Sequence, residues 1–185
     1  MSRRIVIAVV LLTGCSFFSR SKSSFYSLDR IPRSTPVVAV KGIPFGVDSV
    51  QLPAELDRRE VVVRKDNHQL DVRSNQQWSA AFHDIVMETL VFDLASRLPE
   101  GMVVLPGAAR PTALRAIDVV FEDLAAGPQN TLTLDAHWTV RQGTTTSAAH
   151  HEQISIPLQS LDSAQVAAAV SQALAGLADR ISSQL

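Results

Sequence analysis

The chain has 185 residues, of which 46% are hydrophobic, so it is long enough and apolar enough to build one domain with a full core. Its 17 basic and 18 acidic side chains give a formal net charge of −1 at pH 7, and this balance gives no reason to expect nucleic acid as a partner. The single cysteine, Cys15, excludes an internal disulfide, and no run of 18 apolar residues that would span a membrane follows it.

The N-terminus has the layout of a bacterial lipoprotein signal. Arg3 and Arg4 precede the apolar run 5–12, and a lipobox motif ends that run. The residues of this motif are Leu12, Thr13, Gly14 and Cys15. Eight apolar residues rise only ~12 Å as a helix, against a hydrocarbon core of ~30 Å, so the segment is too short to stay as a membrane span. We expect residues 1–14 to be a signal peptide that is removed, and Cys15 to carry a covalent lipid.

Two alternatives remain for this segment: an ordinary signal peptide that contains a cysteine, or a cytosolic chain with an apolar start. Neither explains why the sole thiol lies at the cut site, whereas lipidation converts that thiol into an anchor. Several acyl chains, at ~0.8 kcal/mol per buried methylene, hold a protein stably on a bilayer. Ser16, rather than Asp, follows Cys15, and the usual bacterial sorting rule then favours the outer membrane, with the domain facing the periplasm.

Residues 15–24 are predicted to be a lipidated, serine-rich tether, and residues 25–185 a single globular domain. As a flexible chain the tether reaches only ~15 to 18 Å, which keeps the domain close to the bilayer. Removing residues 1–14 with their two arginines takes the formal charge from −1 to −3. The aromatic segment 25–28 predicts a short first strand, and the continuous apolar run 37–40 a second strand that is buried on both faces.

The middle of the chain predicts a buried strand and a long helix. Val61–Val63 form a β-branched run, and residues 66–67 mark a turn into a short segment around Leu70 and Val72. From Trp78 to Leu98 apolar residues recur at steps of three and four, which predicts a helix. Ser74 and Gln77 have capping-box spacing, and Pro99 ends the pattern. The apolar run 102–105 then predicts a strand, and a strand–helix–strand order would place the two strands parallel.

The second half of the chain predicts an antiparallel meander and a final helix. Apolar residues alternate with polar ones over 113–124 and 132–140, with a hairpin turn at 127–130, and a further strand covers 148–156. Asp162 and Gln165 have capping-box spacing before an apolar stripe that continues to the C-terminus. The residues of this stripe are Ala167, Val170, Leu174, Leu177 and Ile181. The stripe predicts a helix that docks on the sheet.

No catalytic signature accompanies these elements. The sequence lacks the G-x-S-x-G, G-x-x-x-x-G-K-[ST], G-x-G-x-x-G and H-E-x-x-H motifs, so we expect no enzyme activity and no cofactor other than the lipid on Cys15. His150-His151-Glu152 is the nearest approach to a metal cluster, but only His150 and Glu152 share a strand face. Two ligands are too few for zinc, so we interpret this segment as a solvated strand rim and expect no metal. His83 is interpreted as a surface helix residue.

One segment supports a family resemblance. The string from Gln51 to Arg64, QLPAELDRREVVVR, is followed by Asn67, Leu70 and Trp78, and the domain opens with Phe25-Tyr26-Ser27-Leu28-Asp29. This pattern resembles the PqiC-type auxiliary lipoproteins of ABC transport systems over essentially the whole domain. It departs from the family pattern at Arg59, where proline is common, and around Asn67. The resemblance implies a lipoprotein that works beside an MCE-domain protein and an inner-membrane permease, in lipid movement or outer-membrane integrity.

The same segment has two interpretations from its residues alone. It is either a partner-binding loop or a solvated connection whose charges face water. The partner-binding hypothesis rests on Leu52, Pro53, Leu56, Asp57, Arg58 and Arg59.

The predicted fold is α/β: a three-layer sandwich with a mixed parallel and antiparallel sheet and two main helices, resembling the TolB N-terminal domain. The predicted function is a non-enzymatic accessory lipoprotein of an ABC/MCE-type lipid transport system, with homo-oligomerisation left open. The alternatives are an activator or assembly factor of cell-wall or pilus machinery, and a periplasmic hydrolase.

Overall fold

The computed structural model describes residues 22–33, 42–66 and 68–185. The predicted signal peptide, Cys15 and the predicted strand at 37–40 lie outside these residues. In chain order the elements of the described part are β1 (Ser24–Tyr26), β2 (Phe45–Gln51), β3 (Glu60–Arg64), β4 (Leu70–Trp78), α1 (Phe82–Ala95), β5 (Arg115–Gly127), β6 (Thr131–Gln142), β7 (Thr145–Thr146), β8 (His150–Pro157) and α2 (Ser163–Gln184).

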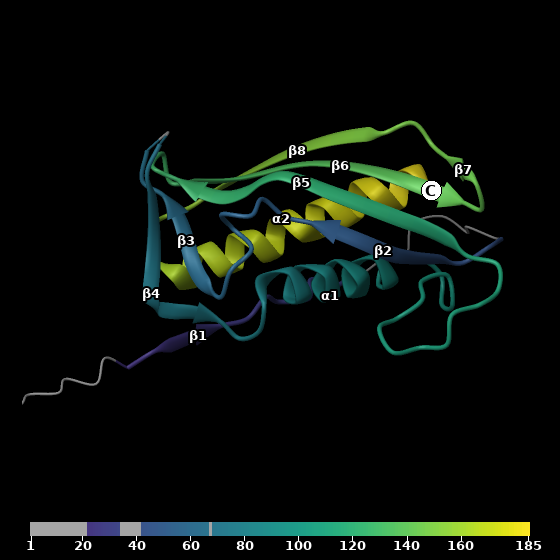
Figure 1. The fold of residues 1–185 in the computed structure, drawn as a ribbon, viewed down its shortest axis with the longest axis horizontal. Coiled ribbons are helices and arrows are strands. Elements are labelled where there is room, and N and C mark those ends of the chain that lie inside the picture. Colours follow the sequence, from purple (N-terminus) through teal and green to yellow (C-terminus); the bar gives the residue numbers. More distant parts are fainter. Residues whose placement is uncertain (1–21, 34–41, 67) are drawn as a thin grey trace, which may run out of the picture.

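The strands of the described part form one mixed sheet (Figure 1). Its main path runs β1-β4-β3-β5-β6-β7, with β2 pairing to β5 and β8 pairing to β6. The pairs β1–β4, β2–β5 and β3–β5 are parallel, whereas β3–β4, β5–β6 and β6–β8 are antiparallel. The predicted fold class, α/β with a mixed sheet and two main helices, is therefore confirmed.

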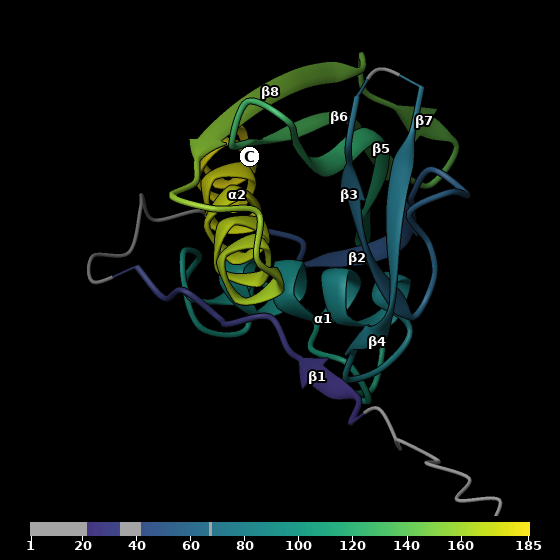
Figure 2. The same ribbon diagram turned by 90° about the vertical axis from the view of Figure 1, so that its left-hand side faces the viewer.

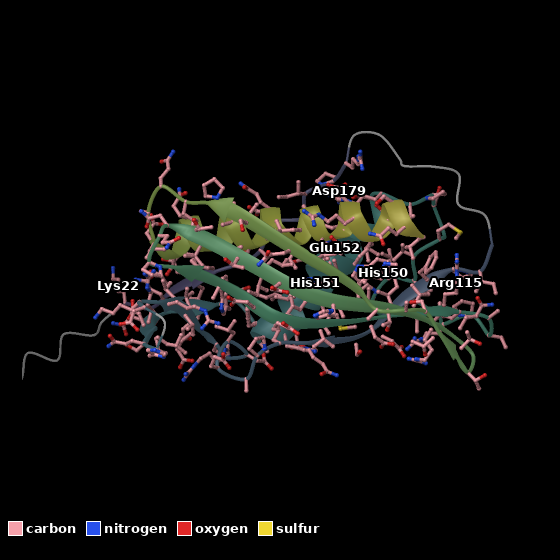
Figure 3. The ribbon with its side chains drawn as sticks, turned by 90° about the horizontal axis from the view of Figure 1, so that it is seen from above. Lys22, Arg115, His150, His151, Glu152 and Asp179 are labelled. Atoms are coloured by element: carbon pink, nitrogen blue, oxygen red, sulfur yellow. The ribbon has the colours of Figure 1, made fainter. Side chains whose placement is uncertain are left out.

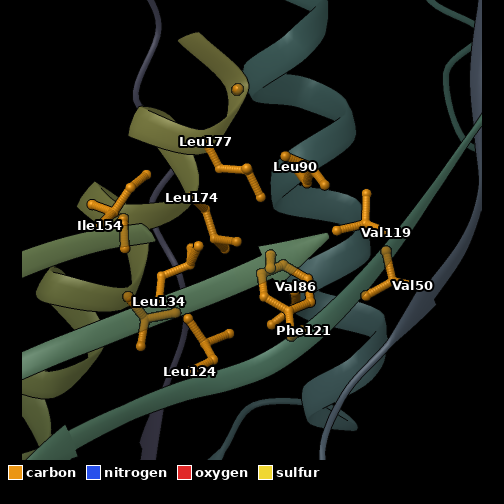
Figure 4. Close-up of a cluster of buried hydrophobic side chains, with 14 of the residues drawn as sticks. Val50, Val86, Leu90, Val119, Phe121, Leu124, Leu134, Ile154, Leu174 and Leu177 are labelled. Atoms are coloured by element: carbon orange, nitrogen blue, oxygen red, sulfur yellow. The ribbon is translucent and has the colours of Figure 1, made fainter. Parts of the chain in front are cut away.

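The two helices pack against each other, and the sheet curves around them (Figure 2). The core lies between these layers: Val86 and Leu90 from α1 and Leu174 and Leu177 from α2 meet Phe121 of the sheet (Figure 4). Each of these side chains is at most 3% exposed, and burial of one such side chain contributes ~1.5 to 3 kcal/mol. All three valines of β3 are buried, as its continuous apolar run predicts, whereas β6 alternates buried and partly exposed positions.

Helix α2 forms as its sequence predicts. Asp162 is the N-cap, and its side chain accepts a hydrogen bond from the backbone N–H of Gln165 at 2.9 Å. The whole predicted stripe, from Ala167 to Ile181, is buried. Small residues let the helix approach the sheet closely, since a Cβ added at Gly176 would lie 3.2 Å from Cδ1 of Ile154 on β8.

The predicted start of the first helix was wrong. Ser74, Gln77 and Trp78 belong to β4, and α1 begins at Phe82 with no side-chain cap at Ala81. Trp78 is held in the sheet, because its backbone N–H donates to the carbonyl oxygen of Arg59 at 2.7 Å and it pairs with β1. Its ring stacks on Phe82 at 4.7 Å between ring centroids, so the four-residue spacing reflects a contact between strand and helix.

Strand β2 was not predicted, because Gly42, Pro44 and Gly46 are residue types that normally favour turns over strands. In the structure Gly46 lies inside β2, where an added Cβ would meet Cδ2 of Leu114 at 3.3 Å. The predicted strand at 102–105 was also wrong, since Val103 forms only an isolated parallel bridge with Phe45. Two backbone hydrogen bonds hold this bridge, from Phe45 N–H to the oxygen of Met102 (2.7 Å) and from Val104 N–H to the oxygen of Phe45 (2.8 Å).

The predicted β5–β6 hairpin is confirmed. Its turn lies at 127–130, and Asn130 adopts a φ of 51°, a left-handed conformation that asparagine tolerates better than most residues. Trp138 of β6 is 1% exposed, as its place in the alternating pattern predicts.

Within the described ranges, neither helix combines the length and the apolar character that crossing a bilayer would require.

Candidate functional site

The segment that follows β1 crosses both helices and ties the start of the domain to them. We call residues 29–33 the N-terminal strap. The backbone N–H of Asp29 donates to Oγ of Ser171 on α2 at 3.0 Å, and that of Ile31 donates to Oδ1 of Asp93 on α1 at 2.8 Å. Nη1 of Arg97 donates to the carbonyl oxygen of Ile31 at 3.0 Å. Because the strap directly follows β1, these bonds fix where the chain leaves the domain towards its N-terminus.

Three charged side chains lie under the N-terminal strap. Asp93 and Arg97 are almost fully buried, and Nε of Arg97 donates to Oδ1 of Asp179 on α2 at 2.9 Å. Nη1 of Arg97 lies 4.0 Å from Oδ1 of Asp93. Burial raises the pKa of Asp93 to about 6, against the opposing pull of the Ile31 N–H and of Arg97. The group therefore ties α1, α2 and the strap together and includes a carboxyl that takes up a proton far more readily than usual.

Two exposed arginines reinforce the strap from outside. The guanidinium of Arg30 lies 3.4 Å from the ring centroid of Phe92 and pairs with Glu88 at 2.6 Å. Arg33 pairs with Asp179 at 3.1 Å. Exposed pairs of this kind contribute little each, so the buried group carries most of the attachment.

The predicted partner-binding residues lie in the loop between β2 and β3, which we call the 52–59 loop. Leu56 is 3% exposed and shares a small apolar cavity with Trp78 and Phe82. The backbone N–H groups of Leu56 and Asp57 both donate to the carbonyl oxygen of Pro53, at 2.9 and 3.0 Å, which makes a tight turn. Oδ1 of Asp57 accepts from the backbone N–H of His83 at 3.2 Å, in the first turn of α1. These residues therefore hold the loop in place.

The other members of the 52–59 loop face outward to different degrees. Leu52 and Pro53 are half-buried, whereas Arg58 and Arg59 are exposed. Nε of Arg58 pairs with Oε2 of Glu60 at 3.1 Å; the pKa of Glu60 is lowered, first by its own backbone N–H and then by Arg58. The loop thus presents Arg58 and Arg59 on a turn that Leu56 and Asp57 fix to the domain.

His83, predicted to be a surface residue, is half-exposed, and its Nε2 lies 2.9 Å from the carbonyl oxygen of Val50.

The segment from His150 to Glu152 differs from the predicted solvated rim. His150 and Glu152 share one face of β8, as expected, but that face is turned to the helices (Figure 3). Glu152 is 8% exposed; its carboxylate accepts from Arg180 at 2.7 Å and from Gln184 at 3.0 Å, both on α2. The rim interpretation was wrong for Glu152, because α2 covers this part of the sheet.

His151 points to the opposite face and joins a cluster that the sequence did not reveal. Asp135 and His137 on β6 and His151 on β8 each place one ligand-type atom within 4.8 Å of the others. Strand pairing sets His137 directly opposite His151. Asp135 and His137 are two residues apart on β6, so the alternation showed that they share a face, but only the register with β8 shows what lies beside them.

A further pocket of about 190 Å³ lies between α1 and the segment 104–110. Its lining includes Met87 and Val91 of α1, Leu105 and, at one side, Arg110. Arg110 and Arg141 both donate to the carboxylate of Asp48, at 2.5 and 2.7 Å, and these bonds lower the pKa of Asp48. The pocket is mostly apolar with one ion-paired side.

The fold and these sites define an α/β domain with a strapped N-terminal end, an exposed arginine turn and an apolar pocket. The chain belongs to the family of ABC-type transport auxiliary lipoprotein components, whose model matches residues 26–182. This description, an auxiliary component of ABC-type transport, agrees with the accessory role predicted from the sequence.

Two solved structures share the fold. A crystal structure of an uncharacterised protein superimposes with a TM-score of 0.72 at 15% identity, over 88% of this chain and 98% of that one. A Xanthomonas campestris protein of the DUF330 family superimposes with a TM-score of 0.65 at 19% identity, over 86% of this chain and 93% of that one. No curated protein is a significant match.

Proposed function

We propose that this chain is a non-enzymatic accessory lipoprotein of an ABC/MCE-type lipid transport system, held on the periplasmic face of the outer membrane by lipid on Cys15. In this role it contacts an MCE-domain protein and an inner-membrane permease and supports outer-membrane integrity. The observation that carries the proposal is the family match over residues 26–182, which starts only eleven residues after the lipobox cysteine. A lipid-anchored chain with so short a tether works close to its membrane.

The lipid anchor is tested by a single substitution at Cys15. Cells expressing the chain are grown with radiolabelled palmitate and fractionated, beside cells expressing Cys15→Ala. The proposal expects label in the wild-type chain and its recovery in outer membranes, with neither in the variant. Mass spectrometry that finds an unmodified N-terminus with residues 1–14 still attached would contradict it.

The 52–59 loop is proposed as a contact surface for the partner protein. Leu56 and Asp57 hold the loop, so Arg59 offers a change that leaves the fold intact. Arg59→Glu is compared with Lys65→Glu, which makes the same charge change at an exposed residue just after β3. Tagged chains are recovered from detergent-solubilised envelopes, and co-purified MCE-domain protein is quantified. We expect a loss of at least fivefold for Arg59→Glu alone; equal recovery from both variants would remove the loop from the proposal.

The alternative role, an activator or assembly factor of cell-wall or pilus machinery, predicts a different set of partners. Recovery of a cell-wall synthase, together with unchanged outer-membrane lipid asymmetry in a deletion strain, would select that role over lipid transport.

A further inference from the structure

We propose that the outer face of the sheet carries a binding site for one transition-metal ion of the Zn²⁺ type, with Asp135, His137 and His151 as its protein ligands. The proposal is independent of the transport role. It departs from the expectation of no metal, which considered the 150–152 segment by itself.

The geometry of the three ligands comes from strand pairing. His137 of β6 and His151 of β8 are directly paired, and their rings stack with centroids 4.6 Å apart and planes 19° apart. Asp135 lies two residues before His137 on the same strand, and its Oδ1 is 2.7 Å from Nε2 of His151. Because β6 is paired on both sides, by β5 and β8, the backbone under the cluster is fixed.

The spacing of the ligand atoms fits a metal ion with small side-chain movements. One atom from each residue lies within 4.8 Å of the other two. In a tetrahedral zinc site with bonds of ~2.0 to 2.2 Å, ligand atoms lie about 3.3 to 3.6 Å apart. His137 and His151 are partly exposed, at 39% and 53% of their side chains, so their rings have room to turn by the remaining distance.

The donor types select the class of metal. Two imidazoles and a carboxylate suit Zn²⁺, Cu²⁺ and Ni²⁺, whereas Mg²⁺ and Ca²⁺ prefer sites made of oxygen ligands alone. Three protein ligands leave the fourth position for water.

The surroundings of the cluster favour a cation. Glu122 on β5 lies beside it, with Oε1 3.1 Å from Nε2 of His137. It is not one of the three mutually close ligands, but its charge adds to that of Asp135 next to two imidazoles. We therefore expect Glu122 to attract the metal ion by its charge without coordinating it. Glu122→Gln should weaken metal binding less than the loss of a ligand does.

The test is calorimetric titration of the full-length chain with ZnSO₄. The chain is purified in detergent with a histidine-free tag, stripped with EDTA and desalted. We expect one Zn²⁺ per chain with micromolar affinity and no binding of Mg²⁺ under the same conditions. His137→Asn and His151→Asn should each weaken Zn²⁺ binding at least tenfold, whereas His68→Asn, at an exposed turn, should leave it unchanged.

Two further measurements control for misfolding of the variants and for metal binding by the thiol. Zn²⁺ should raise the Tm of the wild type and of His68→Asn but not of the two ligand variants, and circular dichroism shows that all of them fold. Cys15→Ser should bind as the wild type does, because the sole thiol takes no part. Absence of binding, equal affinity in the ligand variants, equal binding of Mg²⁺, or loss of binding in Cys15→Ser would each overturn the proposal.

Discussion

The backbone N–H of Ile31 donates a hydrogen bond to the buried carboxylate of Asp93 at 2.8 Å, across 62 positions of the chain. Ile31 belongs to the strap that follows β1, and Asp93 to the last turn of α1, so this bond connects the N-terminal end of the domain to its core. One oxygen of Asp93, Oδ2, is buried without a hydrogen-bond partner among the described residues. A buried carboxylate with an unsatisfied oxygen is costly, which explains why its pKa is raised.

The raised pKa of Asp93 predicts how stability depends on pH. The folded value is about 6 and the ordinary value 3.8, so between these values the folded state binds more protons than the unfolded one. Stability from this group therefore rises as pH falls from about 7 to about 4, by at most ~3 kcal/mol. Asp93→Asn lacks this contribution. Urea unfolding at several pH values should show that the free energy of unfolding of the wild type rises relative to that of the variant as the pH falls.

The comparison with Asp93→Asn isolates this one group. Asp48, Glu60 and Asp162 have lowered pKa values, so they lose stabilisation as the pH falls, but they do so in both proteins. Parallel pH profiles for the wild type and Asp93→Asn would contradict the assignment.

Arg97 is predicted to be essential for the fold at neutral pH. Its side chain is 2% exposed and faces Asp93 and Asp179, so Arg97→Met leaves a buried negative charge without its cation. Removing one partner of a buried pair typically costs ~3 to 5 kcal/mol. Arg33→Met is the matched control, because Arg33 pairs with the same Asp179 at the surface, where the expected cost is ~1 kcal/mol or less. If chemical unfolding shows the same loss in free energy of unfolding for both variants, burial of Arg97 does not explain its contribution to stability.

The burial of Asp93 and Arg97 could not be predicted from the sequence. Asp93 and Arg97 fall between the apolar positions of the 78–98 repeat, and charged side chains at such positions normally face water. In the structure the strap 29–33 covers them, through contacts about 60 positions away in the chain. No local pattern reports a contact of that separation.

The elements that were predicted correctly carry their signals locally. Helix α2 has its cap at Asp162 and its stripe within one segment, and the β5–β6 hairpin joins two alternating strands by a turn at 127–130. The cluster of Asp135, His137 and His151 depends instead on the register between β6 and β8. Strand β7 and its turns intervene between them, so turn geometry did not fix that register.

Leu174→Asp is predicted to unfold the chain or to detach α2. Leu174 is fully buried between α2 and the sheet, and an unpaired carboxylate there costs several kcal/mol, comparable to the whole stability of a small domain. Gln172→Asp places the same charge on the exposed side of the same helix and should be tolerated. Hydrogen exchange measures the outcome: α2 amides should lose protection only in Leu174→Asp. Normal thermal stability with protected α2 amides would refute the prediction.

The close approach of α2 to β8 predicts that Gly176 and Ile154 are energetically coupled. Glycine inside a helix costs ~0.5 to 1 kcal/mol relative to alanine, so Gly176→Ala should stabilise α2 if there is room for the new methyl group. In the wild type that group would lie 3.2 Å from Cδ1 of Ile154, so crowding offsets the gain. Ile154→Val removes Cδ1 at a cost of ~0.5 to 1.5 kcal/mol. In that background Gly176→Ala should stabilise by about 0.5 to 1 kcal/mol more than in the wild type, measured by urea unfolding of all four proteins. The same effect in both backgrounds would mean that Ile154 is not what keeps residue 176 a glycine.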